Sequence, residues 1–292
     1  MSTTLGDGRW ELTDPLGQGT MGTVWRARDR DMHRWVAIKV LSPAMARHEQ
    51  VRERFRREAQ VLQKLRHDRV VRLHELRDTD EGLFIVMDLA EGGSLLTWLR
   101  RNGAMPPRLA IDCAVQAAEG LGYAHGVGVV HRDVKPQNLL IRPDGVAVAD
   151  FGIARLEQAA ISLTRTGVRM GSIGYMAPEQ ARDAKAADHR ADVFGLGATL
   201  FTLLTGIPPG LIKNDLRDHG GKLPDAAARV VMRATLDAPE HRYPSMERLA
   251  RALREAREIT PATPEAEPLF SPELAAEIDP SPSSGPTLVL ED

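Results

Sequence analysis

The chain has 292 residues, of which 42% are hydrophobic and 27% charged, as expected for a soluble globular protein with one large domain or two small ones. Its net charge of −2 argues against a protein that coats nucleic acid or anionic lipid. No apolar run approaches the ~20 residues that span a bilayer, and residues 1–9 lack the pattern of a secretory signal. The single cysteine, Cys113, excludes an internal disulfide and a cysteine-based zinc site. We therefore predict a buried thiol and a cytoplasmic location.

Strands dominate the first 90 residues. Two strand candidates flank a glycine-rich turn, and a third is an apolar, β-branched run that ends before Ser42-Pro43, which marks a turn or a helix start. Apolar residues then recur at helical spacing over residues 51–65, so one face of a helix is expected to pack inward. The five strand candidates are Glu11–Leu16, Thr23–Ala27, Trp35–Leu41, Val70–Leu76 and Leu83–Leu89.

The pattern becomes helical after Gly92-Gly93. A buried helix is predicted for Pro107–His125, followed by two short strands, Leu139–Arg142 and Val146–Ala149, joined by a Pro-Asp-Gly turn. Three later helices are predicted at Ala191–Leu204, Asp225–Ala234 and Ser245–Glu258. The sequence thus favours an α+β fold, with a small β-rich lobe at about residues 10–90 and a larger, mainly helical lobe at about residues 91–258.

The two ends of the chain are predicted to lie outside this domain. Residues 1–9 form an N-terminal extension. Residues 259–292 contain seven acids, seven prolines and no lysine or arginine. Such an acidic segment, repeatedly broken by proline, is typical of disorder, so we predict a disordered tail.

The glycine-rich turn runs Gly17-Gln18-Gly19-Thr20-Met21-Gly22-Thr23-Val24. A G-x-G-x-x-G pattern alone also occurs in dinucleotide-binding folds, where it lies between a strand and a helix. Here it lies between two predicted strands. Glycines in such a hairpin let backbone N–H groups approach phosphate oxygens with no Cβ in the way.

A lysine stands inside the next apolar strand, in Val36-Ala37-Ile38-Lys39. An ammonium group in such a place must be paired or must reach solvent. One interpretation is a side chain that extends to water. The other is a cation for the α- and β-phosphates of a nucleotide, held by an anionic partner such as Glu58 on the helix that follows.

The densest group of polar residues is His131-Arg132-Asp133-Val134-Lys135-Pro136-Gln137-Asn138, and Asp150-Phe151-Gly152 follows the second short strand. In order, these segments resemble the glycine-rich loop, V-A-I-K strand, H-R-D-x-x-x-x-N loop and D-F-G motif of the protein-kinase family. Met176-Ala177-Pro178-Glu179 resembles its A-P-E motif, Asp192 to Gly197 resembles the helix below the catalytic loop, and Arg242 matches the arginine that pairs with the A-P-E glutamate. The resemblance covers roughly residues 10–258.

The resemblance implies a two-lobed protein-kinase fold, with one regulatory helix in the small lobe, and a role for each matched residue. Asp133 would accept or orient the proton of the substrate hydroxyl, and Lys135 would neutralise charge on the transferred phosphoryl group. Asn138 and Asp150 would bind Mg²⁺, or Mn²⁺, with ATP. Lys39 would hold the α/β-phosphates and pair with Glu58. The full set implied to bind the nucleotide is Leu16, Gly17, Gln18, Gly19, Thr20, Met21, Gly22, Val24, Ala37, Lys39, Glu58, Met87, Asp88, Ala90, Leu140 and Asp150.

A separate sequence pattern indicates which type of hydroxyl group accepts the phosphate. A lysine two residues after Asp133 resembles the serine/threonine form of the catalytic loop, and Ala177 to Arg182 resembles eukaryotic-like (Hanks-type) bacterial serine/threonine kinases. By the same resemblance, Thr164 and Thr166 are placed like autophosphorylation sites of the activation segment, which Arg132 would help to order. The other interpretation of these threonines is that they are ordinary polar loop residues.

Two other functions compete with an active protein kinase. A pseudokinase that only binds nucleotide typically lacks the lysine or one of the two aspartates, whereas Lys39, Asp133 and Asp150 are all present. A small-molecule phosphotransferase of related fold would lack the activation segment that ends at Glu179. Candidate partners are protein substrates, a second copy of the chain for autophosphorylation in trans, and a protein that docks on the tail. Neither nucleic acid nor a membrane span is expected.

The chain departs from the family pattern at two places. Residues 205–224 are short where the family has a helix used for docking substrates and partners. Ser94 stands where an acidic residue often contacts the ribose. Neither change removes a catalytic group.

Overall fold

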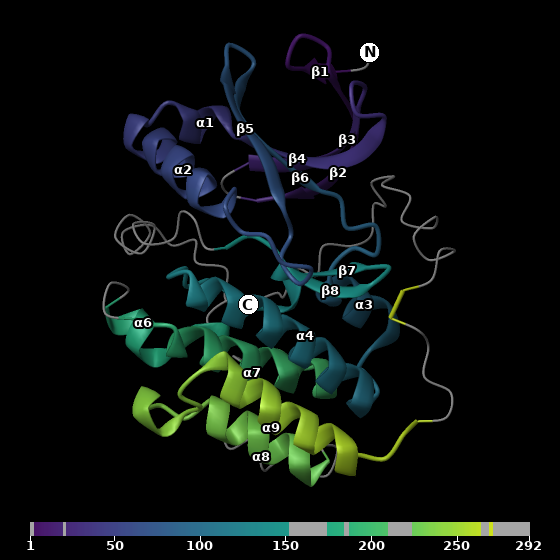
Figure 1. Cartoon of the computed structure of the whole chain (residues 1–292), viewed down its shortest axis with the longest axis vertical. Helices are drawn as coiled ribbons and strands as arrows, with labels where there is room; N and C mark the ends of the chain where they lie inside the picture. The colour runs from purple at the N-terminus through teal and green to yellow at the C-terminus, as the bar shows by residue number, and fades with distance from the viewer. Residues whose placement is uncertain are drawn as a thin grey trace, which may run out of the picture.

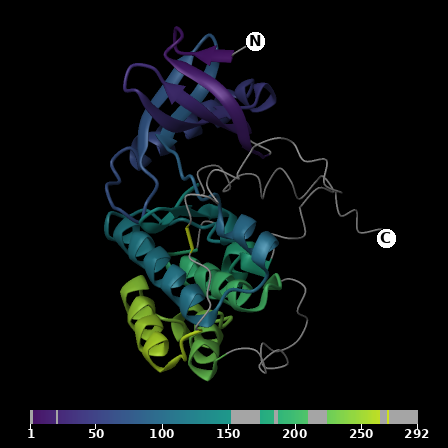
Figure 2. The ribbon, with the colours of Figure 1, turned by 90° about the vertical axis from the view of Figure 1, so that its right-hand side faces the viewer.

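The computed structural model describes residues 3–19, 22–151, 174–183, 187–209, 224–263 and 269–270. It contains two lobes, a twisted sheet flanked by two helices and a larger helical lobe below it (Figure 1). The lobes are stacked along the long axis of the molecule, as the side view shows (Figure 2). The two-lobed α+β architecture predicted from the sequence is therefore confirmed.

The small lobe is an antiparallel sheet of six strands in the order β1-β2-β3-β4-β6-β5. Its elements are β1 (Thr3–Leu5), β2 (Trp10–Gln18), β3 (Gly22–Asp29), β4 (Arg34–Leu41), α1 (Pro43–Ala46), α2 (Glu49–Leu62), β5 (Leu73–Thr79) and β6 (Gly82–Asp88). Ser42 caps α1, because its side chain accepts a hydrogen bond from the N–H of Met45 (3.4 Å).

One strand of this sheet was not predicted. Thr3–Leu5, within the expected N-terminal extension, forms β1 and pairs with Trp10–Leu12 of β2. The buried Trp10 indole meets the Phe84 ring edge-on at 5.6 Å between centroids, which fixes this end of the sheet. Only three residues long, β1 is too short for an alternating pattern to reveal it.

The register of the strands decides which side chains share a face. Val24 lies opposite Lys39 in the β3–β4 pair, and Ala37 lies opposite Met87 in the β4–β6 pair. Residues opposite one another, or two apart along one strand, point to the same face of a sheet. Val24, Ala37, Lys39 and Met87 therefore lie on one face.

The large lobe is mainly helical. Its elements are α3 (Leu95–Asn102), α4 (Pro107–Gly126), η1 (Pro136–Asn138), β7 (Leu139–Arg142), β8 (Gly145–Val148), α6 (Pro178–Arg182), α7 (Arg190–Thr205), α8 (Asp225–Ala234), η5 (Pro239–His241) and α9 (Met246–Ile259). The helices and strands for which ranges were predicted in this lobe are present, with ends that differ by at most one residue, whereas in the small lobe β5 begins and ends three residues later than predicted. None of the described helices is long and apolar enough to cross a membrane.

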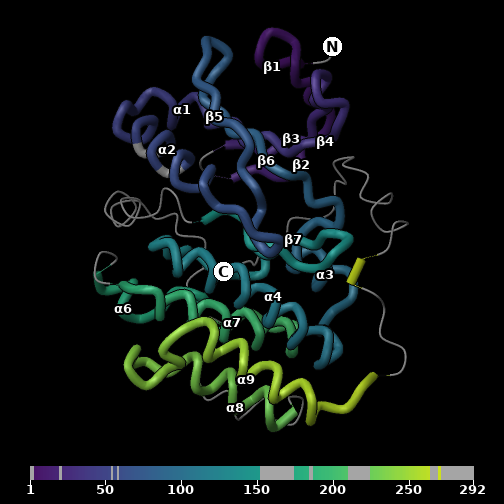
Figure 3. The backbone as a smooth tube through the Cα atoms, viewed as in Figure 1, coloured from purple at the N-terminus to yellow at the C-terminus, as the bar shows by residue number. Residues whose placement is uncertain are grey.

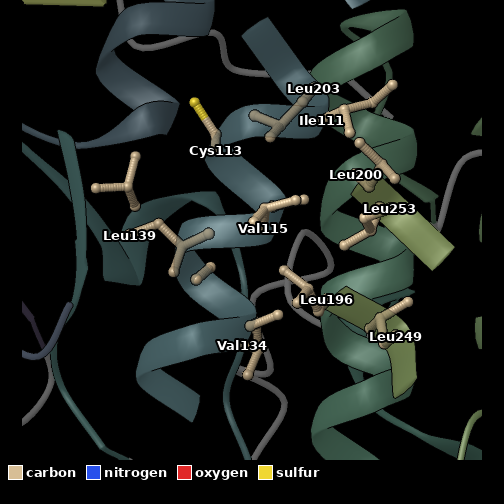
Figure 4. Close-up of a cluster of buried hydrophobic side chains, with 14 of the residues drawn as sticks. Ile111, Cys113, Val115, Val134, Leu139, Leu196, Leu200, Leu203, Leu249 and Leu253 are labelled. Atoms are coloured by element: carbon tan, nitrogen blue, oxygen red, sulfur yellow. The ribbon is translucent and has the colours of Figure 1, made fainter. Parts of the chain in front are cut away.

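The core of this lobe joins α4, α7 and α9. Figure 4 shows Ile111 and Val115 of α4 near Leu196 and Leu200 of α7, with Leu253 of α9 beside them. These side chains are between 0% and 8% exposed, so truncation of any one leucine is expected to cost about 2 to 5 kcal/mol. Together α4 and α7 form the rigid base on which the loops between the lobes are built.

The thiol of Cys113 lies within this core and is fully buried. Burial raises the pKa of the Cys113 thiol to about 12, so the thiol stays protonated near neutral pH. We expect iodoacetamide at pH 8 to leave the folded protein unlabelled and to add one carbamidomethyl group in urea, as measured by intact mass. Labelling of the folded protein at the rate seen in urea would contradict the buried position.

The end of α9 continues into residues that stay attached to the large lobe. Thr260 is 2% exposed, and its carbonyl oxygen accepts a hydrogen bond from Arg108 Nε at 2.6 Å. Leu269 and Phe270 are half-buried and pack against the same hydrophobic core. The predicted disordered tail is thus attached to the lobe at both of its described parts, and its remaining residues lie outside the described ones (Figure 3).

Candidate active site

The catalytic loop is held from below by a buried carboxylate. Asp192, 1% exposed in the first turn of α7, accepts hydrogen bonds from the backbone N–H groups of His131 (2.8 Å) and Arg132 (2.6 Å). His125 Nε2 lies 2.7 Å from the same carboxylate. Arg132 itself adopts a φ of 65°, a conformation rare outside glycine. The loop after Arg132 is therefore fixed to the helical base.

His131 connects the loop to the strand β8. The His131 ring is fully buried, its Nδ1 accepts a hydrogen bond from the N–H of Asp133 (3.1 Å), and its Nε2 lies 2.9 Å from the Ala149 carbonyl oxygen. Because Nδ1 accepts, Nε2 carries the proton and donates it to the carbonyl. The ring also meets Phe151 at 4.6 Å between centroids, so the residues on either side of Asp150 are tied to the catalytic loop.

Three predicted catalytic side chains meet in this loop. Lys135 Nζ lies 2.9 Å from Asp133 Oδ2. Asn138 Nδ2 donates to both the carbonyl oxygen (2.8 Å) and Oδ2 (3.1 Å) of Asp133. Since the amide nitrogen of Asn138 faces Asp133, the amide oxygen, which is the atom able to ligate a metal, faces away from it. The arrangement presents one carboxylate, one ammonium and one amide within a few ångströms.

Lys39 of β4 reaches across from the small lobe to Asp150. The Nζ–Oδ1 distance is 2.5 Å, and Asp150, like Arg132, has a positive φ, of 50°. Desolvation by the surrounding protein would raise the pKa of Asp150, but the charge and the hydrogen bond of Lys39 outweigh it, so the pKa lies below its usual range. The Asp150 carboxylate is therefore ionised at neutral pH, as a metal ligand must be.

The predicted partner of Lys39 is not tested by this geometry. Glu58 belongs to α2, but its side chain lies outside the described residues. Among the described side chains, the ion pair of Lys39 is with Asp150, 111 positions further along the chain. The Lys39–Glu58 pair stays a prediction.

The glycine-rich turn joins β2 and β3, as predicted. The backbone groups of Gly19 and Gly22 bond to each other in both directions, at 2.9 and 3.3 Å. A Cβ on Gly22 would lie 1.9 Å from the Val40 carbonyl oxygen, so only glycine fits there, whereas Gly17 and Gly19 have room for one. Thr20 and Met21 lie outside the described residues, and Leu16 is 42% exposed.

The other predicted nucleotide-binding residues lie where the lobes join. Leu140 of β7 forms a bridge with Ser94, at the start of α3, while Val24, Ala37 and Met87 share a face of the upper sheet. The N–H of Asp88 donates to the Arg72 carbonyl oxygen (3.0 Å), so this N–H is not available to a bound base. The segment from Asp88 to Ala90 connects β6 to the large lobe.

The side chain of Asp88 has partners that sequence reasoning missed. His74 Nε2 lies 2.7 Å and Arg142 Nη1 3.9 Å from its carboxylate, which links β5, the connecting segment and β7. Burial alone would raise the pKa of Asp88, but the hydrogen bond and charge of His74 lower it below its usual range. His74 and Arg142 carry no motif, so no local pattern could have indicated them. His125, the partner of Asp192, was missed for the same reason.

The end of the activation segment is fixed by a buried ion pair. Arg242, with no exposed side-chain surface, donates to Glu179 Oε1 and Oε2, both at 2.7 Å. Gln180 Nε2 donates to the Arg132 carbonyl oxygen (2.7 Å), which joins this region to the catalytic loop. The predicted regulatory sites Thr164 and Thr166 lie outside the described residues.

A match to a known family identifies the protein family of this chain. The model of the protein kinase domain matches residues 10–257. The chain belongs to the protein kinase family. The matched range contains both lobes except β1, includes each motif described above, and ends within two residues of the end of α9.

The relatives with sequences similar to this chain are bacterial serine/threonine kinases, as the resemblance predicted. The kinase is 38% identical over 255 residues to serine/threonine-protein kinase PknB of Mycobacterium leprae, covering 80% of this chain and 41% of the relative. It is 38% identical over 271 residues to PkaA of Streptomyces coelicolor, covering 84% and 49%. The chain thus spans about half or less of the length of these curated relatives.

Solved structures agree with the fold. The crystal structure of the Mycobacterium tuberculosis PknI kinase domain superposes with a TM-score of 0.70 at 30% identity, covering 88% of this chain and 99% of that one. Rad53 residues 1–466 in complex with AMP-PNP gives a TM-score of 0.66 at 25% identity, covering 84% and 65%. Protein kinases in general use ATP and Mg²⁺.

Proposed function

We propose that this kinase transfers the γ-phosphate of Mg·ATP to serine or threonine hydroxyls of proteins. The observation that carries the proposal is the connected set of Asp133, Lys135 and Asn138 beside the Lys39–Asp150 ion pair. Phosphoryl transfer requires positioning and charge neutralisation more than covalent chemistry, and this set supplies both. Membership of the protein kinase family and the serine/threonine kinases among its relatives support the same function.

Each side chain has a defined part in the proposed reaction. The hydroxyl oxygen of the substrate forms a bond to the γ-phosphorus, the bond between that phosphorus and the oxygen of ADP breaks, and Asp133 accepts or orients the hydroxyl proton. Lys135 offsets the charge on the transferred group. Lys39, now paired with Asp150, would hold the α- and β-phosphates.

The residues present fit Mg²⁺ as the metal. Within the described part of the chain, no group of three or more His, Cys, Asp or Glu side chains could hold an ion by itself. One carboxylate, Asp150, and one amide, Asn138, suit an ion that takes its other ligands from phosphate oxygens and water. When bound, Mg²⁺ supplies positive charge to the clustered phosphate oxygens. The ionised state of Asp150 prepares that residue for this role.

Labelled ATP distinguishes phosphate transfer to proteins from the two alternative functions, a small-molecule phosphotransferase and a nucleotide-binding scaffold. We expect label on a generic basic protein and on the kinase itself, and none on small hydroxylated drugs. Transfer to the drugs alone would favour a small-molecule phosphotransferase. Binding of Mg·ATP with no transfer to any acceptor would favour a nucleotide-binding scaffold. A cytoplasmic location and self-association stay predictions.

Autophosphorylation of Thr164 and Thr166 is the regulatory part of the proposal. We expect mass spectrometry after incubation with Mg·ATP to find phosphate on one or both threonines. Their joint replacement by alanine is expected to lower the rate of transfer to a protein substrate, because a phosphate there could pair with Arg132 and order the segment. An unchanged rate and an unchanged phosphate content in the double variant would contradict this role.

A further inference from the structure

The C-terminal segment returns to the large lobe at two separate points. At the first, Thr260 is buried, its hydroxyl donates to the Ala256 carbonyl oxygen (2.7 Å), and its own carbonyl accepts from Arg108 of α4. This contact attaches the chain to the large lobe at the residue that follows the end of α9. The predicted disordered tail therefore does not leave the domain where the last helix ends.

At the second point, Leu269 and Phe270 pack against the hydrophobic core of the large lobe. They lie beside α3 in both views of the molecule (Figures 1 and 2). Helix α3 supplies Leu95, Trp98 and Leu99 to that core, and the same helix lies against η1 and β7. Two adjacent large apolar residues from a strongly polar segment are thus partly shielded from water at this one place.

The charges around the two apolar surfaces are complementary. In the sequence, Leu269 and Phe270 stand between Glu267 and Glu273, in a segment from 259 onward that contains no lysine or arginine. Helix α3 carries exposed arginines at positions 100 and 101 in its last turn. An apolar pair flanked by acids suits an apolar surface flanked by arginines.

We propose that the surface beside α3 is a docking site for a short acidic peptide with two adjacent large apolar residues, and that Leu269-Phe270 of the same chain occupies it. An occupant on the same chain acts at an effective concentration of about 1 mM, so a docking Kd well below about 1 mM keeps the site filled. The inference rests on packing and charge, and does not depend on phosphate transfer.

The test is a binding measurement on the full chain. A fluorescent peptide with the sequence of residues 264–275 is titrated, without nucleotide, with the native chain and with the Leu269→Ala/Phe270→Ala variant. We expect the peptide to bind the double variant at least about ten times more tightly, because its site is vacant there. The matched control is Ile259→Ala, an apolar residue of the same segment that is 67% exposed, which should behave like the native chain.

Two further variants test the recognition chemistry. A peptide with alanine at both apolar positions should not bind. Adding Arg100→Glu/Arg101→Glu to the double variant should weaken binding of the native peptide. Added salt should also weaken binding of this peptide to the double variant in which both arginines are intact. Affinity that responds to neither the apolar pair nor the arginines would overturn the assigned site.

Equal peptide affinity for the native and variant chains would overturn docking on the same chain. A concentration-dependent dimer that disappears in the double variant would also overturn it, by assigning the pair to a neighbouring copy.

Discussion

The Asp133→Asn variant is expected to transfer phosphate about 10² to 10⁴ times more slowly than the native chain, the range that a general base contributes. The amide has the shape of the carboxylate but cannot accept the hydroxyl proton. It also removes the negative partner of Lys135, whose Nζ lies 2.9 Å from Oδ2. Because Asn138 also bonds to the backbone carbonyl of residue 133, the loop should keep its shape.

This prediction is checked by steady-state kinetics and by binding of Mg·ATP to the same preparations. Nucleotide affinity should change little, because Asp133 is not among the predicted nucleotide ligands. The matched control is Asp144→Asn, an aspartate that is 48% exposed in the β7–β8 turn and pairs locally with Arg142. Asp144→Asn should retain the native rate. A native rate in Asp133→Asn would mean that another group accepts the proton.

The Arg242→Met variant is expected to lose about 3 to 5 kcal/mol of folding stability, as when one partner of a buried ion pair is removed. The guanidinium donates five hydrogen bonds, two to Glu179 and three to the carbonyl oxygens of residues 190, 236 and 237. Methionine fills part of the volume of the Arg242 side chain but donates no hydrogen bond to any of these acceptors. At about 2 to 4 °C per kcal/mol, calorimetry should show a melting temperature lower by roughly 6 to 20 °C.

A second arginine serves as the control for this variant. Arg254, which is 54% exposed, pairs with Glu119 on the surface of the large lobe. Because exposed pairs contribute at most about 1 kcal/mol, Arg254→Met should shift the melting temperature by only a few degrees. Equal shifts for the two variants would show that burial of Arg242 is not what makes its ion pair important.

The same ion pair predicts a dependence on pH. Burial would raise the pKa of Glu179, but the hydrogen bonds from Arg242 outweigh it and hold the pKa below its usual range. The contribution of Glu179 to stability is therefore full above its unfolded pKa of about 4.3, and is lost as the pH falls through the lower folded value. In Glu179→Gln, stability between pH 6 and pH 3 should fall less steeply than in the native chain.

Local signals in the sequence were sufficient for the elements and for most of the active-site residues. The glycine-rich turn lies between strands, Lys39 lies in an apolar strand, and the motif with Asp133 follows a long buried helix, all as predicted. Such features depend on strand alternation, helical spacing and turn residues, which act over a few positions. Exceptions are β1, which is too short to show a pattern, α3, for which no range was predicted, and the course of the chain after α9.

Only the tertiary structure decided how these residues are paired. Lys39 meets Asp150, the catalytic loop rests on Asp192 sixty positions later, and Asp88 is held by His74. The same holds for the tail, whose composition predicted disorder, although Leu269 and Phe270 pack against the core. The sequence by itself therefore determined the family, the fold and the chemical groups of the site. Which distant groups meet depends on the path of the whole chain, because contact between them requires a geometry that no short segment encodes.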